Sequence, residues 1–216
     1  MRMRFLIMAN GDYGDIDWYR RQVGRFDRII CVDGGAGRAK KMGIVPDWIV
    51  GDMDSIAGAD RRHMEEAGAC FKVFPPEKDF TDTQLALELA EKEGAGEIVV
   101  WGGTGSRLDH TLSNLCSASS FALKGIKVIF DSPALTIHLV KDRLVLPGDL
   151  GDTVSLIVLG DRATGVSLKG FRYPLEGATL EGNWQWAVSN VITGADPVIQ
   201  VSSGVLAVFH YKECVP

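Results

Sequence analysis

Two aspartates in the segment 51–55, which reads Gly-Asp-Met-Asp-Ser, have a spacing suited to binding one metal ion. They follow a short apolar run, and residues two apart in extended backbone point to the same side, so the carboxylates of Asp52 and Asp54 converge. Holding like charges together is unfavourable unless a cation neutralises them, and oxygen ligands suit a hard ion such as Mg²⁺. We therefore predict a Mg²⁺ site here, in preference to a plain turn made of two aspartates.

Asp82 is a candidate third ligand and ends the segment 78–82, Lys-Asp-Phe-Thr-Asp. It also has a structural explanation, because carboxylates are common in the first turn of a helix and Thr81 is a suitable helix cap. Both interpretations stay open. Lys78 adds a cation that could bind phosphate oxygens, although ordinary surface charge is the commoner role of a single lysine.

A glycine-rich segment at 102–106, Gly-Gly-Thr-Gly-Ser, lies between a predicted strand and a predicted helix. Backbone N–H groups in such a turn can bind a phosphate at the start of a helix. The segment matches neither a Walker A loop nor a GxGxxG loop, because no Gly-Lys-Ser/Thr follows and Leu108 stands where the third glycine would be. Arg107 supplies a cation beside it, and together they predict a phosphate-binding loop.

Further candidate binding residues lie in other turns and near the C-terminus. Asn10 and the segment 33–36, Asp-Gly-Gly-Ala, each follow an apolar run, and the glycines either let a nucleotide approach the backbone or form a tight turn. In segments 171–175 and 184–190, aromatic side chains stand beside small polar ones. Such a surface can bind a flat or cationic heteroaromatic ligand, although core packing is the commoner role of a tryptophan.

The elements that must position these residues follow from the apolar runs. Up to about residue 130, β-branched runs alternate with helical stretches, which predicts an α/β fold with an open, mostly parallel sheet and flanking helices. Strands are predicted at 5–9, 28–32, 48–50, 71–74, 98–101 and 127–130, and the clearest helix at 109–124. Leu112, Leu115 and Leu123 share the helix face expected to pack on the sheet. Ligands of such sheets bind beyond the carboxyl ends of the strands, where the acidic and glycine-rich segments lie.

After residue 132 the pattern changes to short apolar segments separated by Gly and Pro turns, at 135–140, 143–146, 153–159 and 205–211. This pattern predicts a C-terminal antiparallel β-sandwich. We therefore predict two domains, an α/β domain at 1–132 that binds nucleotide and metal and a β-sandwich domain at 133–216.

Composition argues against several other classes of protein. The 216 residues are 46% hydrophobic and 24% charged, which is ordinary for a globular chain, and the net charge of −5 gives no electrostatic case for a nucleic-acid or membrane partner. No apolar stretch approaches the ~20 residues that cross a bilayer, and the N-terminal run is too short for a signal peptide. We expect a cytoplasmic protein. The four cysteines are widely spaced, which argues against a zinc site and for reduced thiols.

Four segments together resemble thiamine pyrophosphokinases: PDWIVGDMDS, EKDFTDTQLAL, GGTGSRLDHTLSNL, and GFRYPL followed by AVSN, with DGGA ahead of them. The resemblance spans most of the chain and implies an α/β domain followed by a β-sandwich that binds thiamine and forms a homodimer. The thiamine site would lie between the α/β domain of one subunit and the β domain of the other. The implied reaction transfers pyrophosphate from ATP to the hydroxyethyl group of thiamine, with Mg²⁺, and gives thiamine diphosphate and AMP.

The resemblance also implies roles for individual residues. Asp52, Asp54 and Asp82 would bind the metal. Catalysis would rest on Asp52, Asp82, Lys78 and Arg107. ATP would contact Asn10, Asp33, Gly34, Gly35, Lys78, Thr104 and Arg107, and thiamine would contact Asp109, Tyr173, Ser189 and Asn190.

The aromatic segments depart from the family pattern, so the ring that stacks on thiamine stays open. Two other functions are also possible interpretations of the sequence. Tyr173 stands where eukaryotic members carry tryptophan, Ala187 replaces a glycine common in bacterial members, and Trp184 and Trp186 are unusual, so which aromatic ring stacks on thiamine is undecided. One alternative function is a pyrophosphokinase for another hydroxyalkyl heterocycle, such as a pterin. The other is a non-enzymatic nucleotide sensor, which would not need the full set of carboxylates.

Overall fold

The computed structural model describes residues 2–54, 56, 58–75, 77 and 79–212, and the chain divides into two compact units between Ser117 and Ala118. This division lies within a helix, whereas the sequence pattern places a boundary at 132/133. Residues 118–132, which include the end of that helix and the strand that follows it, therefore belong to the C-terminal unit. The domain boundary at 132/133 stays a prediction.

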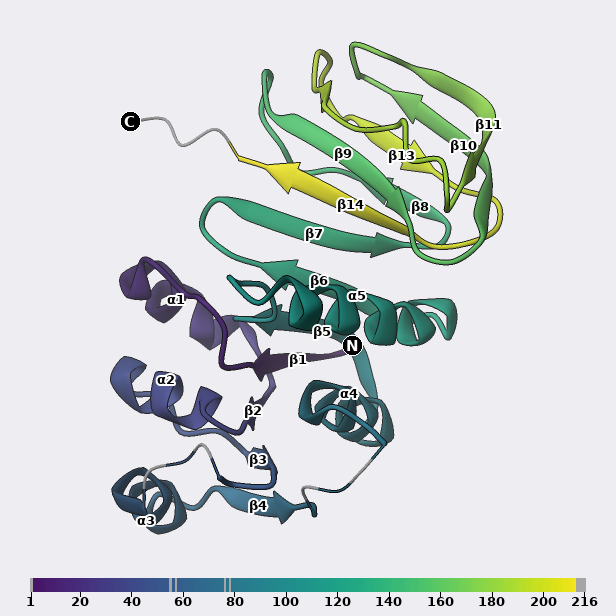
Figure 1. Cartoon of the computed structure of the whole chain (residues 1–216). Coiled ribbons are helices and arrows are strands. Elements are labelled where there is room, and N and C mark those ends of the chain that lie inside the picture. The colour runs from purple at the N-terminus through teal and green to yellow at the C-terminus, as the bar shows by residue number, and fades with distance from the viewer. Residues whose placement is uncertain (1, 55, 57, 76, 78, 213–216) are drawn as a thin grey trace. The chain divides into compact units, whose positions relative to one another are not determined.

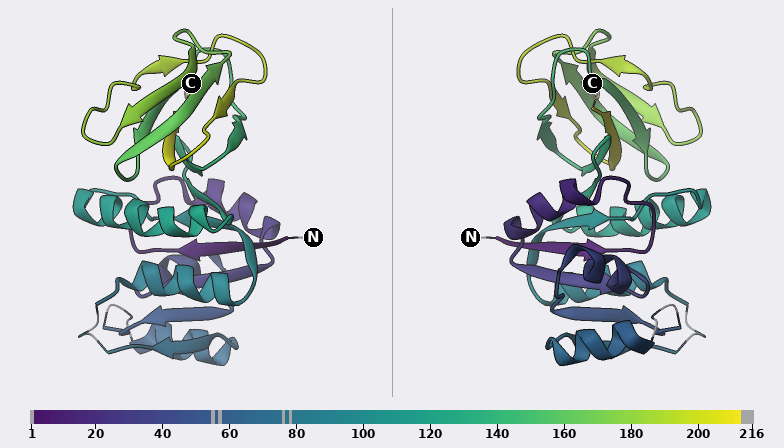
Figure 2. Two further views of the ribbon diagram at one scale, coloured as in Figure 1. Left: turned by 90° about the vertical axis from the view of Figure 1, so that its right-hand side faces the viewer. Right: turned by 90° about the vertical axis from the view of Figure 1, so that its left-hand side faces the viewer.

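The N-terminal unit is an open parallel sheet with helices between its strands (Figure 1). Its strands are β1 (Met3–Met8), β2 (Arg28–Val32), β3 (Trp48–Gly51), β4 (Cys70–Val73) and β5 (Ala95–Trp101). Its helices are α1 (Ile16–Gln22), the 3-10 helix η1 (Val23–Arg25), α2 (Gly35–Met42), α3 (Gly58–Glu66) and α4 (Asp82–Lys92), followed by the start of α5 (Leu108–Leu123). Figures 1 and 2 show α1, α2 and α3 on one face of this sheet and α4 on the other.

The strand order in this unit is β5-β1-β2-β3-β4, with every pair parallel. Strands β1 and β5 are covered on both faces, so residues such as Leu6 and Val99 are almost fully buried and the two strands are continuous apolar runs in the sequence. Strands β1 to β4 follow one another across the sheet in chain order. After α4 the chain crosses back, and β5 pairs with the other side of β1. A topological switch point therefore lies between β1 and β5, where open sheets of this type bind ligands.

Helix α5 begins and ends within one residue of the predicted helix, but its buried face differs from the prediction. Leu115 and Phe121 are buried, whereas Leu112 and Leu123 expose 61% and 58% of their surface. The expected packing of Leu112 and Leu123 is therefore wrong. Leucines occur on more than one side of this helix, so their spacing alone could not select the face that is buried.

The C-terminal unit contains two antiparallel sheets, with strand orders β12-β9-β14-β7-β6 and β11-β10-β13-β8. The first sheet contains β6 (Lys127–Asp131), β7 (Leu135–Val140), β9 (Thr153–Val158), β12 (Asn190–Val191) and β14 (Leu206–Tyr211). The second contains β8 (Arg143–Val145), β10 (Arg162–Lys169), β11 (Leu175–Glu181) and β13 (Val198–Gln200). Leu156 and Val208 from the first sheet share one buried core with Val166 and Ile199 from the second. The predicted α/β fold with an antiparallel β-sandwich is confirmed.

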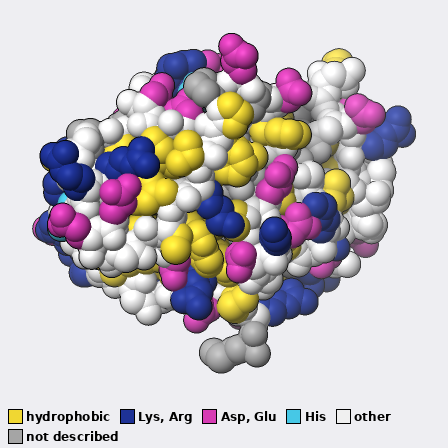
Figure 3. All heavy atoms as spheres, turned by 90° about the horizontal axis from the view of Figure 1, so that it is seen from below, with side chains coloured by type: hydrophobic (Ala, Val, Ile, Leu, Met, Phe, Trp, Pro, Cys, Tyr) yellow, Lys and Arg dark blue, Asp and Glu magenta, His cyan; other side chains and the backbone are white. Residues whose placement is uncertain are grey.

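Two surface observations bear on possible partners. On the face shown in Figure 3, Lys and Arg side chains lie among Asp and Glu side chains, so the two signs of charge offset each other there. Among the described residues, no helix has the length and apolar character needed to span a membrane.

Candidate active site

A cavity of about 670 Å³ lies at the switch point of the N-terminal sheet. Its walls come from the loops after β1, β2 and β5, the first turn of α4 and the first two turns of α5. The predicted site residues among its lining are Asn10, Asp33, Asp82, Thr104, Arg107 and Asp109. A cavity of this size suits a small-molecule ligand, and the sheet topology explains why residues distant in sequence meet there.

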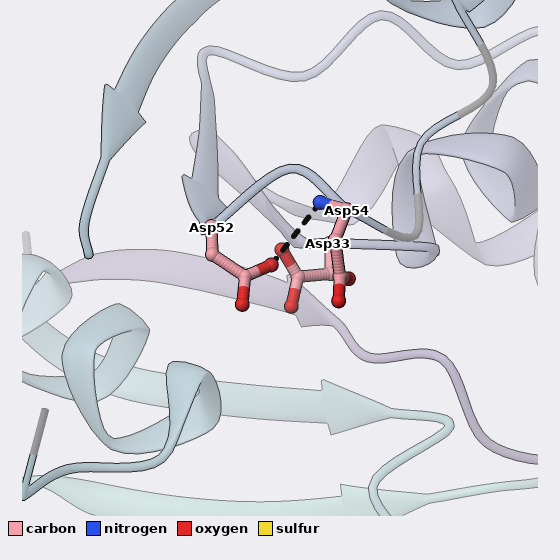
Figure 4. Close-up of side chains that lie close together, drawn as sticks. All are labelled: Asp33, Asp52 and Asp54. Carbon is pink, nitrogen blue, oxygen red and sulfur yellow. Dashed lines mark hydrogen bonds between the residues drawn. The ribbon is translucent and has the colours of Figure 1, made fainter. Parts of the chain in front are cut away.

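Three carboxylates lie close together beside this cavity. Asp33, Asp52 and Asp54 each offer one oxygen, and these oxygens all lie within 4.8 Å of one another (Figure 4). The N–H of Asp54 also donates to Asp52 Oδ1 at 3.1 Å. Since β2 and β3 are adjacent parallel strands, the residues after them share one sheet edge, which brings Asp33 to the pair predicted from spacing. Asp33 was predicted as an ATP contact rather than as a member of this group.

Among the described residues, Asp82 is not one of the three clustered carboxylates but lies next to them. Its side chain hydrogen-bonds to that of Asp33. Asp82 is also the first residue of α4, where Thr81 Oγ1 caps the helix by accepting the N–H of Gln84 at 3.2 Å. The structure thus shows the helix-start geometry and a contact with the acidic group at once. Its role as a metal ligand stays a prediction.

The carboxyl group of Asp33 binds its proton unusually tightly. Burial raises its pKa to about 7, with further increases from the hydrogen bond and charge of Asp82 and from the charge of Asp52. The N–H of Met53, 3.4 Å from Asp33 Oδ1, acts in the opposite direction. A cation would stabilise the charged form of these groups, and a set of carboxylate oxygens fits a hard ion such as Mg²⁺.

The backbone of this corner is constrained. Asp33 has φ of 42°, and its carboxylate lies where a side chain at position 51 would be, because a Cβ on Gly51 would stand 1.7 Å from Asp33 Oδ1. Among the described residues other than glycine, positive φ occurs at Asp33, Met53, Ser189 and Asp196. The first three lie in segments that the sequence singled out, as is common for functional loops.

Protein acceptors already occupy part of the glycine-rich loop. The N–H of Gly105 donates to Thr111 Oγ1 at 3.3 Å, and the N–H of Ser106 donates to Asp12 Oδ2 at 3.0 Å. The prediction that the N–H groups of this loop face a phosphate is therefore wrong for these two. The physical reason is that a side chain from the neighbouring loop and one from the first turn of α5 reach them.

Four residues of this site were not predicted as functional. Asn114 Nδ2 donates to the carbonyl of Gly103 at 2.8 Å, and Tyr13 lies buried beneath the two loops, while Asp12 and Thr111 bind the loop as described above. One signal was present in the sequence, because Thr111 and Asn114 are three residues apart and hence on one face of the helix. The contact of Asp12 with Ser106 spans 94 positions and left no local signal.

Arg107 and Asp109, which were predicted to bind different ligands, bind each other. Arg107 Nε donates to Asp109 Oδ1 at 3.0 Å and Arg107 Nη2 to Asp109 Oδ2 at 2.6 Å, which is a two-point ion pair on a mostly exposed surface. This contact raises the pKa of Arg107 and holds the pKa of Asp109 well below its usual range. Both residues therefore stay charged over a wide pH range.

The predicted thiamine residues of the C-terminal unit lie together. The N–H of Tyr173 donates to Asn190 Oδ1 at 3.0 Å, and Asn190 Nδ2 donates to the carbonyl of Tyr173 at 2.7 Å. Asn190 is buried, so its amide holds the backbone of Tyr173, whose side chain is 62% exposed. Ser189, with φ of 56°, donates its N–H to Ser155 Oγ at 2.9 Å.

The other predicted residues have less structural detail. Gly34 and Gly35 lie at the start of α2 and are not among the lining of the cavity. Trp184 and Trp186 expose 72% and 49% of their surface and lie in an irregular segment, apart from a single bridge between Trp184 and Glu181. Lys78 lies outside the described residues.

An open parallel sheet with a cavity at its switch point, flanked by carboxylates and a glycine-rich loop, defines an α/β protein of the nucleotide-binding class. Residues 19–130 match the family described as "Thiamin pyrophosphokinase, catalytic domain", and residues 136–206 match "Thiamin pyrophosphokinase, vitamin B1 binding domain". The chain therefore belongs to the thiamin pyrophosphokinase family, whose members are ATP-dependent pyrophosphotransferases. The predicted family and enzyme class are confirmed.

Relatives across bacteria and animals agree with this assignment. The chain is 29% identical to "Thiamine pyrophosphokinase" of Bacillus subtilis over 188 residues, covering 82% of this chain and 84% of the relative. It is 27% identical to "Thiamin pyrophosphokinase 1" of Caenorhabditis elegans over 198 residues, covering 82% and 76%. The crystal structure of the Bacillus subtilis enzyme superposes with a TM-score of 0.82 at 24% identity, covering 97% of this chain and 99% of that one, which shows a common fold.

Proposed function

We propose that this chain transfers the pyrophosphoryl group of ATP to the hydroxyethyl oxygen of thiamine in a Mg²⁺-dependent reaction. Family membership supports the transfer reaction. The observation that carries the metal dependence is the group of three carboxylates, Asp33, Asp52 and Asp54, beside a cavity at the switch point. Oxygen-only ligands of this kind fit Mg²⁺ rather than a softer metal.

The metal would be held by Asp52 and Asp54, with Asp33 or the predicted ligand Asp82 completing the set. When bound, Mg²⁺ supplies positive charge to the phosphate oxygens, which lowers the cost of the charge that builds up during transfer. Asp33 and Asp82 lie close enough to hydrogen-bond, so ionising both together needs a nearby cation.

The residues predicted as ATP contacts would orient the nucleotide. Arg107 and Lys78 would bind phosphate oxygens, and Asn10, Thr104 and the backbone at 33–35 would contact the nucleotide. The hydroxyethyl oxygen then forms a bond to the β-phosphorus and its proton is released to solvent, while the bond from that phosphorus to the bridging oxygen breaks and AMP leaves with that oxygen. Catalysis would come mainly from positioning and charge stabilisation.

Thiamine would be held by an aromatic ring and a few fixed polar groups. Tyr173 offers an exposed ring whose backbone Asn190 holds in place, with Ser189 and Asp109 as polar contacts. Cationic thiazolium and flat pyrimidine rings both bind well to an aromatic face.

We also propose a homodimer with shared active sites, located in the cytoplasm. Exposed apolar side chains in each unit support a covering subunit, since surfaces of this kind commonly mark interfaces. They are Leu108 and Leu112 in the N-terminal unit and Tyr173, Trp184 and Trp186 in the C-terminal unit.

The decisive experiment is incubation of the purified chain with ATP, thiamine and Mg²⁺, followed by chromatography of the products. We expect equal amounts of AMP and thiamine diphosphate, and a loss of both when a chelator removes the metal. Formation of ADP and thiamine monophosphate would contradict pyrophosphoryl transfer. A parallel reaction with a hydroxymethyl pterin tests the alternative acceptor, and turnover of the pterin but not of thiamine would overturn the assignment.

A further inference from the structure

The loop that follows β1 is joined to the glycine-rich loop along most of its length. The N–H of Gly11 donates to the carbonyl of Gly102 at 2.9 Å, and the N–H of Asp12 donates to the carbonyl of Thr104 at 3.4 Å. The carboxylate of Asp12 then accepts the N–H of Ser106 at 3.0 Å. These contacts fix the path of the glycine-rich loop from its first residue to its last.

Tyr13 anchors the same two loops from below. Its buried hydroxyl donates to the carbonyl of Ala9 at 2.8 Å and lies 3.3 Å from the carbonyl of Trp101. Its ring fills the space beside Gly102, where a Cβ would stand 2.4 Å from Tyr13 Cε2 and where φ is 63°. Gly102, the first residue of the loop, therefore packs directly against the ring of Tyr13, and any side chain at position 102 would clash with that ring.

We infer that Asp12 and Tyr13 form a clasp that holds the glycine-rich loop in the shape that binds ATP, which makes both of them positioning residues. Neither residue is among the lining of the cavity, so the clasp acts through the loop and not by touching the nucleotide. The loop contains Thr104 and leads directly into Arg107, which are the predicted ATP contacts. This inference rests on the proposed function, because it assumes that the cavity binds ATP.

The test measures binding of the α,β-methylene analogue of ATP by calorimetry without thiamine, together with steady-state kinetics. Asp12→Ala should weaken analogue binding and raise the KM for ATP by roughly three- to tenfold, the loss expected for one hydrogen bond. The kcat of Asp12→Ala and its KM for thiamine should change by less than about twofold, because the glycine-rich loop is proposed to affect only the binding of ATP in the ground state. Asp12→Asn retains an acceptor oxygen and should keep most of the affinity, and Tyr13→Phe should change affinity in the same direction as Asp12→Ala.

Asp15→Ala is the matched control. Asp15 lies in the same loop and also accepts backbone N–H groups, those of Asp17 and Trp18 at 2.9 and 3.2 Å, but these contacts only cap α1. Its loss should lower the melting temperature without changing ATP affinity.

Three results would overturn the clasp: normal analogue affinity in folded Asp12→Ala, equal weakening by Asp12→Asn and Asp12→Ala, or equal weakening by Asp15→Ala. If the unmodified chain binds no analogue at all, the proposed function fails instead. The two failures are therefore distinguishable.

Discussion

The cavity of the N-terminal unit and the exposed aromatic residues of the C-terminal unit are two different kinds of candidate binding region. The cavity is partly enclosed and charged, with Asp33 in its wall, two more carboxylates beside it and Arg107 at its rim. In the C-terminal unit, by contrast, the uncharged aromatic residues Tyr173 and Trp184 are mostly exposed to solvent. A charged, enclosed site can bind phosphate and cation within one subunit, whereas an open aromatic surface gains most of its affinity when a second surface covers it.

The two regions nevertheless hold their backbones in the same way. Asn114 binds the carbonyl of Gly103 in one, and Asn190 binds both backbone groups of Tyr173 in the other. In each case a buried asparagine amide fixes a loop, and different side chains then present the chemistry. The contrast between the regions therefore lies in what the loops carry rather than in how they are held.

The largest expected effect comes from removing a charge at the carboxylate group. Asp52→Asn or Asp54→Asn should lower turnover at limiting Mg²⁺ by roughly 100-fold or more, because the ion that stabilises the developing charge is lost. The fold should be unchanged by circular dichroism.

Asp17→Asn is the control for that experiment, since it neutralises an exposed aspartate of α1 whose side chain is 70% exposed. Near-normal turnover in folded Asp52→Asn and Asp54→Asn would show that the charged cavity does not bind the catalytic ion.

Subunit mixing tests whether the two regions act across a dimer. Asp52→Asn and Ser189→Arg chains should each be inactive alone, but a mixture should recover up to about a quarter of normal activity, because half of the dimers are mixed and each has one intact site. Light scattering gives the oligomeric state. A fully active monomer would contradict the shared site.

A smaller effect is expected on the aromatic side. Tyr173→Ala should weaken thiamine binding by about 1 to 2 kcal/mol, as for loss of one stacking contact, while ATP affinity changes little. Tyr173→Trp should keep or improve binding by calorimetry.

Tyr211→Ala is the matched control, because Tyr211 is also an exposed tyrosine of this unit and carries no proposed role. If Trp184→Ala or Trp186→Ala abolishes binding while Tyr173→Ala binds normally, the stacking ring is a tryptophan and the Tyr173 assignment is wrong.

The smallest effect at neutral pH is expected from a buried histidine of the C-terminal unit, His138, which matters mainly in acid. Burial lowers the pKa of His138 to about 3, with the charges of Lys127, His210 and Lys212 adding to the shift. The unfolded chain takes up this proton below pH ~6.5 and the folded chain does not, so His138 lowers stability progressively as pH falls from about 6.5 toward 3.

His138→Leu should therefore reduce the loss of stability between pH 6.5 and 4.5, measured by urea unfolding, by roughly 2 to 3 kcal/mol. Parallel curves for the His138→Leu variant and the unmodified chain would exclude a contribution from His138.

The fold was largely predictable because apolar runs mark strands directly. The runs at 28–32 and 135–140 coincide with β2 and β7, and the change of pattern after residue 132 marks the β-sandwich. Strands β10 to β13 were not predicted individually. Glycine and polar residues interrupt the apolar pattern in β10 and β11, and β12 and β13 are only two and three residues long, too short to show an alternation.

The site was predictable where its residues are neighbours in sequence and not where they come together through the sheet. The pairing of Asp52 with Asp54 is visible from their spacing, but the position of Asp33 beside them depends on β2 lying next to β3. The face of α5 shows the same limit, since the exposure of Leu112 depends on what surrounds the helix and not on its own periodicity.

The conformation of Asp33 is unfavourable for the folded N-terminal unit unless a ligand compensates it. This residue combines a left-handed backbone, a desolvated carboxyl group and two acidic neighbours, and all three penalties disappear when the chain unfolds. If a cation binds only the folded chain, as proposed for Mg²⁺, it would offset these penalties, and thermal stability would then rise with the free metal concentration. The metal content of the surrounding solution would in that case set how firmly this unit stays folded.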